Sequence, residues 1–186
     1  SNVTQSWEWS QAADQSALVR AEYDILSDLT FFVDFGGGLT QVDRLFGTPT
    51  ITNAAGNTTS TPGYYKFNVS RLTYDAGLRG TFHTGEVRHA VALQASRYQD
   101  AIYRGIVNAS SAVLSNIYSP IAQPSQSVAA PSQVPKISQS TLGGVALADT
   151  MSAFGDRVQL TLGLRWQQIA SDNFSTTTGA ITSAYN

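Results

Sequence analysis

Hydrophobic and polar residues alternate along several long stretches of the chain. The clearest example is VQLTLGLRWQ, residues 158–167, in which every second side chain is apolar and Gln, Thr, Gly or Arg stands between them. A period of two residues predicts a β-strand with one apolar and one polar face. The apolar positions of this strand are Val158, Leu160, Leu162, Leu164 and Trp166.

Five further stretches show the same alternation, and short turn-forming segments join the six stretches in pairs. The pattern predicts three β-hairpins, over residues 16–42, 64–98 and 141–170. Helical periodicity is scarce: residues 102–114 fit a short helix, but Gly105 and the β-branched residues disfavour it. The expected fold class is therefore all-β, an antiparallel up-and-down meander of about six long strands.

The lengths of the connections also alternate along the chain. The turns within the predicted hairpins have about four residues, whereas long polar loops cover residues 43–63, 99–140 and 171–186. In an antiparallel meander, all the short turns lie at one end of the sheet and all the long loops at the other. Outer-membrane barrels have this asymmetry, and a tilted strand of ~9–11 residues crosses the hydrocarbon core. We therefore expect residues 1–186 to form part of a transmembrane β-barrel, with the apolar face toward lipid and the polar face toward a hydrated lumen.

Composition and charge narrow the possible partners. Charged residues make up 13% of the chain, about half the usual share of a soluble domain. The net charge is −2 and no cluster of Lys or Arg is present, so a nucleic-acid partner is not expected. No cysteine is available for a disulfide or a thiolate metal site. No apolar run approaches the ~18 residues of a membrane-spanning helix.

Several stretches resemble the barrel of TonB-dependent siderophore receptors. GVALADTMSAFGDRVQLTLGLRWQ, residues 144–167, is similar to a receptor stretch in which a strand ends in Asp, the turn carries Asp-Arg and the next strand carries Gly-x-Arg. GLRGTFHTGEVRHAVALQASR, residues 77–97, resembles another receptor hairpin. SNIYSP, residues 115–120, matches an N-x-Y-x-P element, and SALVRAEYDILSDLTFFVDFGGG, residues 16–38, resembles a strand pair of the same receptors. These stretches follow the family's order over most of the chain.

The resemblance implies a receptor of the bacterial outer membrane that binds a ferric siderophore and is energised through TonB. A complete receptor would also carry a plug domain, a TonB box, about 22 strands and a terminal strand, none of which is seen here. The chain is thus expected to be a fragment of the barrel domain that cannot transport alone, because contact with TonB needs the missing N-terminal part. Barrel and loop aromatics of the family contact the siderophore, which makes Tyr98, Tyr103 and Tyr118 the candidate ligand-binding residues.

Six strands are too few to close a transmembrane barrel, since the smallest has eight. The fragment would therefore have two sheet edges with unpaired backbone groups. We expect these edges to pair with another copy of the chain, or the fragment to close in a non-native way.

No combination of residues predicts an enzyme. The two histidines, His83 and His89, flank one turn; they would share a side of one continuous strand, but Gly85 interrupts it, so they are expected to be solvated or interfacial residues without metal partners. Nucleophile motifs such as Gly-x-Ser-x-Gly are absent, and the scattered carboxylates form no acid–base couple. Arg20, Glu22 and Asp24 share the lumen side of one strand, where an ion pair with Arg79 or Arg165 is expected. No catalytic residue, metal site or cofactor is predicted.

Two other functions remain compatible with the alternating strands. One is a passive porin or another outer-membrane barrel, which a plug domain upstream would exclude. The other is a soluble secreted β-sandwich for binding or adhesion, whose apolar faces would pack against one another. The Gly36-Gly37-Gly38 run is not followed by the helix start or Gly-Lys-Ser/Thr of a phosphate loop, and glycines in a strand mark a bend or the close approach of another backbone, which in a plugged barrel would be the plug.

Overall fold

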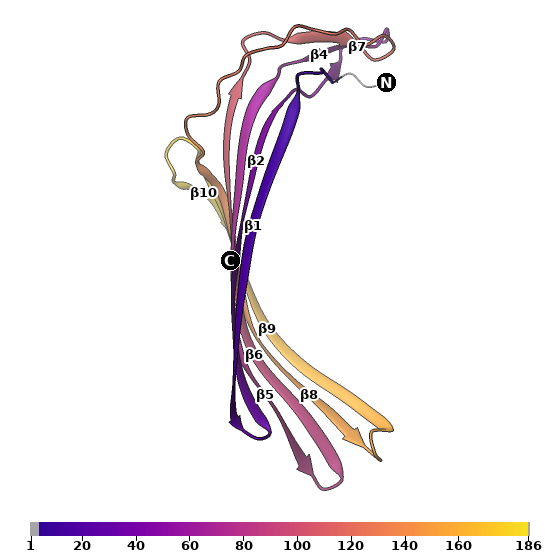
Figure 1. Ribbon diagram of the computed structural model, residues 1–186, viewed down its shortest axis with the longest axis vertical. Coiled ribbons are helices and arrows are strands. Elements are labelled where there is room, and N and C mark those ends of the chain that lie inside the picture. Colours follow the sequence, from indigo (N-terminus) through magenta and orange to yellow (C-terminus); the bar gives the residue numbers. More distant parts are fainter. Residues whose placement is uncertain (1–3, 186) are drawn as a thin grey trace.

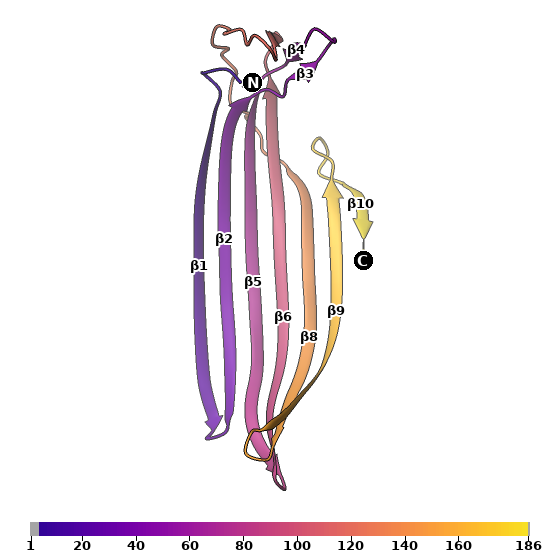
Figure 2. The same cartoon turned by 90° about the vertical axis from the view of Figure 1, so that its right-hand side faces the viewer.

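The computed structural model describes residues 4–185, which form a curved, open sheet of seven antiparallel strands in the order β1-β2-β5-β6-β8-β9-β10 (Figures 1 and 2). Each strand pairs with neighbours that follow it or precede it among these seven, so the sheet is an up-and-down meander. The strands are β1 (Trp9–Leu26), β2 (Leu29–Phe46), β5 (Gly63–Thr84), β6 (Val87–Asn108), β8 (Lys136–Ala153), β9 (Val158–Phe174) and β10 (Ile181–Tyr185). The predicted fold class is confirmed.

The six long strands have 17 to 22 residues and extend beyond the predicted hairpins at the loop end. There, residues such as Ser10 and Gln11 are polar at successive positions, so the alternation stops although the backbone ladder with β2 continues. β6 likewise continues to Asn108, which places residues 102–108 in a strand and not in the short helix that their periodicity fits. Hydrophobic alternation reports which faces differ in polarity; it does not report where pairing ends.

A second, smaller sheet lies in the long loops above the main one (Figure 1). It consists of β3 (Thr50–Ile51), β4 (Asn57–Ser60) and β7 (Val113–Asn116), in the order β3-β4-β7. β4 comes from the β2–β5 connection and β7 from the β6–β8 connection, so their pairing ties two long loops together.

The other end of the sheet has short turns, as the sequence predicts (Figure 2). Gly85 and Glu86 alone connect β5 to β6, and Gly85 has a φ of 60°. Glycine adopts this left-handed conformation without steric cost, and it is favoured at the first position of a two-residue type II′ turn. The β8–β9 turn contains Phe154 and Asp156, whose φ angles of 55° and 64° are unusual for residues with a side chain.

The main sheet is a single layer within residues 4–185, and its first and last strands do not meet (Figure 2). Four buried hydrophobic residues stand out, Leu45, Val69, Ala101 and Val113, and they lie toward the loop end. The stability of the middle of the sheet therefore depends on backbone hydrogen bonds and cross-strand pairs rather than on a packed interior. The described residues include no helix long and apolar enough to cross a membrane.

Substitution of Gly77 will test how closely the strands and side chains pack on the polar side. A Cβ added there would lie 2.3 Å from the backbone oxygen of Leu93 and 2.6 Å from the Phe32 ring. We expect Gly77→Ala to lower the free energy of unfolding by about 1–3 kcal/mol, the usual cost of overpacking. Urea unfolding of the protein in lipid vesicles measures the change.

Gly163→Ala is the matched control, because the nearest atom to its added Cβ is the Leu147 oxygen at 3.6 Å, an ordinary contact. This variant should be neutral or slightly more stable, since alanine restricts the unfolded chain. Equal losses from both substitutions would contradict the packing difference between the two glycines.

Candidate functional site

The strand register gathers the predicted apolar positions on one side of the sheet, here called the apolar face. One row crosses it from β1 to β9, and the residues of the row are paired strand by strand. Its members are large and, apart from the half-buried Leu78, exposed: Tyr23 is 70% exposed and Leu164 78%. Water-soluble monomers rarely leave so continuous an apolar surface uncovered. The row consists of Tyr23, Phe31, Leu78, Leu93, Leu147 and Leu164.

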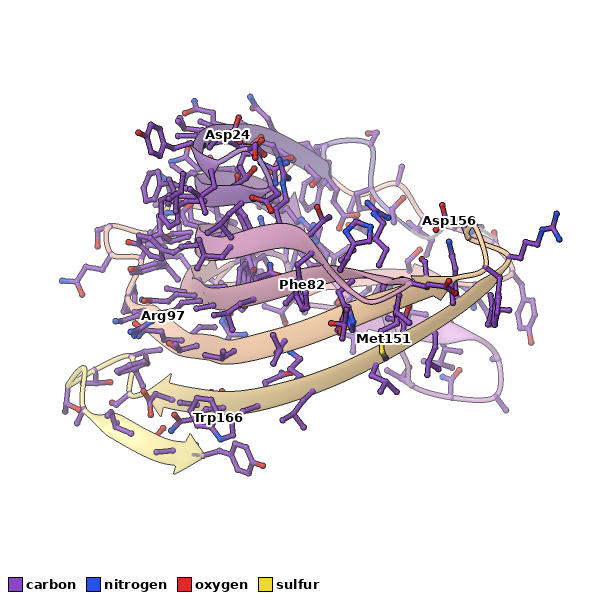
Figure 3. All side chains as sticks on the ribbon, turned by 90° about the horizontal axis from the view of Figure 1, so that it is seen from below. Asp24, Phe82, Arg97, Met151, Asp156 and Trp166 are labelled. Atoms are coloured by element: carbon purple, nitrogen blue, oxygen red, sulfur yellow. The ribbon has the colours of Figure 1, made fainter. Side chains whose placement is uncertain are left out.

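The opposite side, here called the polar face, carries charged and hydroxyl side chains. Arg20 of β1 pairs in register with Asp34 of β2, and its Nε and Nη2 donate to the two carboxylate oxygens over 2.6 and 2.8 Å. This bidentate geometry fixes both side chains, and Asp34 is only 8% exposed. Side chains extend from both sides of the sheet when it is seen from below (Figure 3).

A second ion pair confirms a specific expectation from the sequence. Arg79 of β5 donates to Glu22 of β1 across the intervening strand. The prediction named Arg79 or Arg165 as the partner. Arg165 lies on β9, which is separated from β1 by four strands of the sheet. The pair of Arg20 with Asp34 was not predicted, although Asp34 occupies a polar position of the neighbouring strand.

A hollow of about 430 Å³ lies over the glycine run in β2. Gly36 and Gly38 occupy polar-face positions, opposite Leu18 and Ser16 of β1. Because these glycines have no side chains, the surface is recessed there, and Leu18, Arg71 and Tyr98 stand around the recess. The hollow can hold a side chain or part of a ligand, which fits the expectation that another group approaches the glycines closely.

The three predicted ligand tyrosines lie at different places. Tyr98 is on the polar face, paired with Thr73, and lines the hollow. Tyr103, also in β6, pairs with Asn68 and follows a break in the β6–β8 register. Its odd position places it on the opposite face from Tyr98. Tyr118 stands in the β7–β8 connection and is 74% exposed. The structure thus does not bring the three together, and their binding roles stay a prediction.

The N-x-Y-x-P element fixes the position of Tyr118. Asn116 donates from Nδ2 to the Ala55 oxygen and to Asn57 Oδ1, both over 2.8 Å. Its own Oδ1 accepts the backbone N–H of Tyr118 over 2.8 Å. Gly56, with a φ of 79°, lets the tyrosine ring approach, since an added Cβ would lie 2.6 Å from it. The motif therefore works as a clasp between two loops, with the tyrosine exposed beside it.

The segment before β1 is anchored to the same loops. Gln5 Nε2 donates to the Ile121 oxygen over 3.1 Å, and its Oε1 accepts the Gln123 N–H over 2.8 Å. Trp7 donates from its indole nitrogen to the Gln123 oxygen over 3.1 Å. These loops and the segment before β1 lie together at the loop end of the sheet (Figure 1). The sequence predicts the loops only as long polar connections.

The two histidines lie on opposite faces of the sheet, because the turn at Gly85 interrupts the alternation. His83 pairs with Arg88, whereas His89 pairs with Phe82 and with Met151. The two-residue turn aligns odd positions of β5 with even positions of β6, so His83 belongs to the polar face and His89 to the apolar face. Among residues 4–185, no group of three or more His, Asp and Glu side chains is arranged to hold a metal ion.

Comparisons with known proteins agree with this geometry. The ferrichrome receptor FcuA of Yersinia enterocolitica is 31% identical over 177 residues, which cover 93% of the chain. The crystal structure of BauA, the ferric preacinetobactin receptor of Acinetobacter baumannii, superposes with a TM-score of 0.72 and 30% identity over 98% of the chain. The chain resembles the barrel of siderophore receptors. The predicted resemblance to TonB-dependent siderophore receptors is thereby confirmed.

A further comparison concerns the fold, and the matched lengths show how much of each relative the chain covers. The ferric-catecholate import receptor Fiu from Escherichia coli K12 shares the fold, with a TM-score of 0.74 and 17% identity over 98% of the chain and 29% of Fiu. No family model matches. The chain spans 23% of FcuA and 28% of BauA. FcuA, BauA and Fiu are receptors, which agrees with the prediction that the chain is not an enzyme.

Proposed function

We propose that this chain forms part of the wall and loops of a bacterial outer-membrane receptor that imports a ferric siderophore. The identity with a ferrichrome receptor, which extends over 93% of the chain, carries the proposal. The apolar face meets lipid and the polar face lines the lumen, because a strand in a membrane must satisfy its backbone within the sheet and present apolar side chains outward. The short turns face the periplasm and the long loops face the exterior.

The energy for import comes from the inner membrane through TonB, which contacts a part of the receptor outside this chain. Within the chain, the ordered loops receive the chelate and the hollow over Gly36 and Gly38 holds either the plug or the passing ligand. Tyr118 and Tyr98 are the best placed of the candidate contacts, since one is exposed on the loops and the other lines the hollow. Tyr103 lies on the face directed away from the lumen.

The alternatives are less well supported. A secreted β-sandwich would cover the apolar face with a second sheet, whereas residues 4–185 place only one layer there. A passive porin would share the two-faced strands, but the sequence identity is with receptors of ferric chelates. The isolated chain keeps two open edges and is expected to self-associate through them.

Growth under iron starvation tests the proposed function. A strain that lacks the full-length gene should fail to grow on at least one ferric siderophore from a panel and should grow normally on a directly permeable iron source. The full-length gene on a plasmid should restore growth, and a copy without the TonB-contacting segment should not. Unchanged uptake of every chelate by the deletion strain would refute the receptor assignment.

A further inference from the structure

The long loops, with the strand ends that adjoin them, carry no charged side chain. Residues 45–65 and 105–135 contain no Asp, Glu, Lys, Arg or His, and residues 173–186 contain none either. At the chain's average of 13% charged residues, residues 105–135 alone would carry about four. Apart from Glu8, every charged residue of the chain lies in one of the six long strands or in a short turn at the other end of the sheet. The loops that receive the chelate in the proposed function are therefore neutral.

Glu8, the exception, is engaged within the chain. Its Oε1 accepts the N–H of Gly47 over 2.9 Å and its Oε2 that of Gln5 over 3.1 Å, so the carboxylate holds the segment before β1 to the β2–β5 connection. Two cations of the polar face, Arg44 and Arg104, lie in the strand ends next to the loops. Arg44 borders a hollow together with Glu8, so its charge is partly compensated. The loop end of the chain therefore offers little net charge to a ligand.

The same loops present aromatic, apolar and hydrogen-bonding groups without charge. Tyr118 is 74% exposed, and its backbone N–H donates to Asn116 Oδ1 over 2.8 Å. Leu114 and Ile121, which belong to the same connection between β6 and β8, are also exposed. Ser119, directly after Tyr118, is exposed as well. Such a surface binds by contact with aromatic and apolar side chains and by neutral hydrogen bonds.

Ferric siderophores differ in net charge according to their chelating groups. Three hydroxamates, each with one negative charge, cancel the charge of Fe³⁺, whereas three catecholates, each with two, leave an excess of three negative charges. Transfer of an anion from water to a binding site is strongly unfavourable unless cationic groups pair with it. A loop surface without Lys, Arg or His lacks these partners and suits a neutral chelate instead.

We propose that these loops bind a ferric chelate without net charge, of the trihydroxamate class, and select it over anionic chelates. Tyr118 packs on the organic shell of the chelate, and amide and hydroxyl groups of the loops donate hydrogen bonds to its carbonyl oxygens. The inference rests on the proposed function, in which the loops receive a ferric siderophore, and adds the charge and the chelating groups of that siderophore.

Equilibrium dialysis of radioiron-labelled chelates against the purified full-length receptor in detergent measures this selectivity. The neutral set consists of the ferric trihydroxamates ferrioxamine E, ferrichrome and coprogen, and the anionic set consists of the ferric tris-catecholates of enterobactin and bacillibactin. We expect the best-bound neutral chelate to have a Kd at least about tenfold lower than either anionic chelate. Its Kd should change less than about twofold between low and high salt, because ions screen only interactions between charges.

Charged substitutions at Ser119 test whether the bound chelate carries charge. This side chain is exposed and follows Tyr118 directly, so Ser119→Lys and Ser119→Glu place opposite charges at one position of the loop. A neutral chelate should bind both variants with Kd values within about twofold of each other at low salt. A chelate with three negative charges would instead bind Ser119→Lys at least about tenfold more tightly than Ser119→Glu.

Removal of the Tyr118 ring tests where the chelate lies. Tyr118→Ala should raise the Kd of the neutral chelate about tenfold, as truncation of a central aromatic contact does. Tyr23→Ala is the matched control, because Tyr23 has a similar exposed fraction but lies on the apolar face, and this variant should keep the Kd of the wild type. Each variant is first checked for the heat-resistant mobility of a folded barrel.

Tighter or equal binding of a tris-catecholate by the wild-type receptor would overturn the proposal. The same conclusion would follow from unequal binding of the neutral chelate by the two Ser119 variants, or from unchanged binding by folded Tyr118→Ala. Binding of neither set, together with growth of the wild type on another ferric siderophore, would refute the neutral-chelate inference alone. Failure of every chelate in both binding and growth would refute the receptor function, and this inference with it.

Discussion

Arginine in place of Leu93 will lower the free energy of unfolding of the receptor in a membrane by about 2–4 kcal/mol. Leu93 lies in the middle of the apolar row that crosses six strands, between Leu78 and Leu147. An arginine on the lipid side of a barrel costs about 2–4 kcal/mol near the bilayer midplane. Because single domains have only ~5–15 kcal/mol of stability, this loss should move the unfolding midpoint to a clearly lower urea concentration, measured in phospholipid vesicles.

Gln94→Arg is the control for this substitution. Gln94 is the next residue of β6, lies on the polar face and donates to Asp75. An arginine there keeps a carboxylate partner and, in the proposed orientation, remains in water, so the folded fraction should stay near that of the wild type. If the two variants unfolded at the same urea concentration, the faces would not differ in their solvent and the lipid-facing assignment would be wrong.

The alternation of side chains between the two faces of a strand explains why so much of the sheet could be predicted. Hydrophobic alternation assigns Leu164 to the apolar face, and the register of β8 with β9 carries the same assignment to Leu147. The relation is local to each strand and repeats every two residues, so no tertiary information is needed. The short turns were predictable for the same reason, since Gly85 identifies the reversal between two alternating runs.

The loops could not be predicted in this way. β4 pairs with β7 through residues such as Asn57 and Asn116, which are 59 positions apart and carry no alternating pattern. Such pairing depends on side-chain hydrogen bonds that form only when both loops are in place. The N-x-Y-x-P element is therefore recognisable from the sequence by resemblance, but its role in joining the two loops through Asn116 is not.

The candidate residues show where the alternation of side chains could not be applied. The sequence predicts a strand that ends at Tyr98 and places Tyr103 in the following loop, whereas both belong to β6 and, being five residues apart, lie on opposite faces. His83 and His89 are separated by a two-residue turn, where an odd position of one strand aligns with an even position of the next. The contact of His89 with Asp149 on the apolar face follows only from the register of β6 with β8.

Reversing the charge of Arg20 will destabilise the polar face, and reversing its partner as well will restore much of the loss. Arg20→Asp places a fourth carboxylate beside Asp34, Glu22 and Asp75, of which Asp34 is 8% exposed. Like charges at cross-strand positions repel one another. We expect a lower urea midpoint in vesicles and a defect that becomes smaller at high salt, because ions screen charges in a hydrated lumen.

The double variant Arg20→Asp with Asp34→Arg separates pairing from simple loss of arginine. It keeps both groups in register and adds a contact between the new arginine and Asp75, whose Oδ1 is buried without a donor among residues 4–185. About half or more of the lost stability should return, as coupled neighbours in a double-mutant cycle are not additive. Additive losses at all salt concentrations would show that Arg20 and Asp34 act independently. Recovery would instead establish that charge complementarity between β1 and β2 stabilises the lumen wall beside the hollow in which the proposed ligand or plug is held.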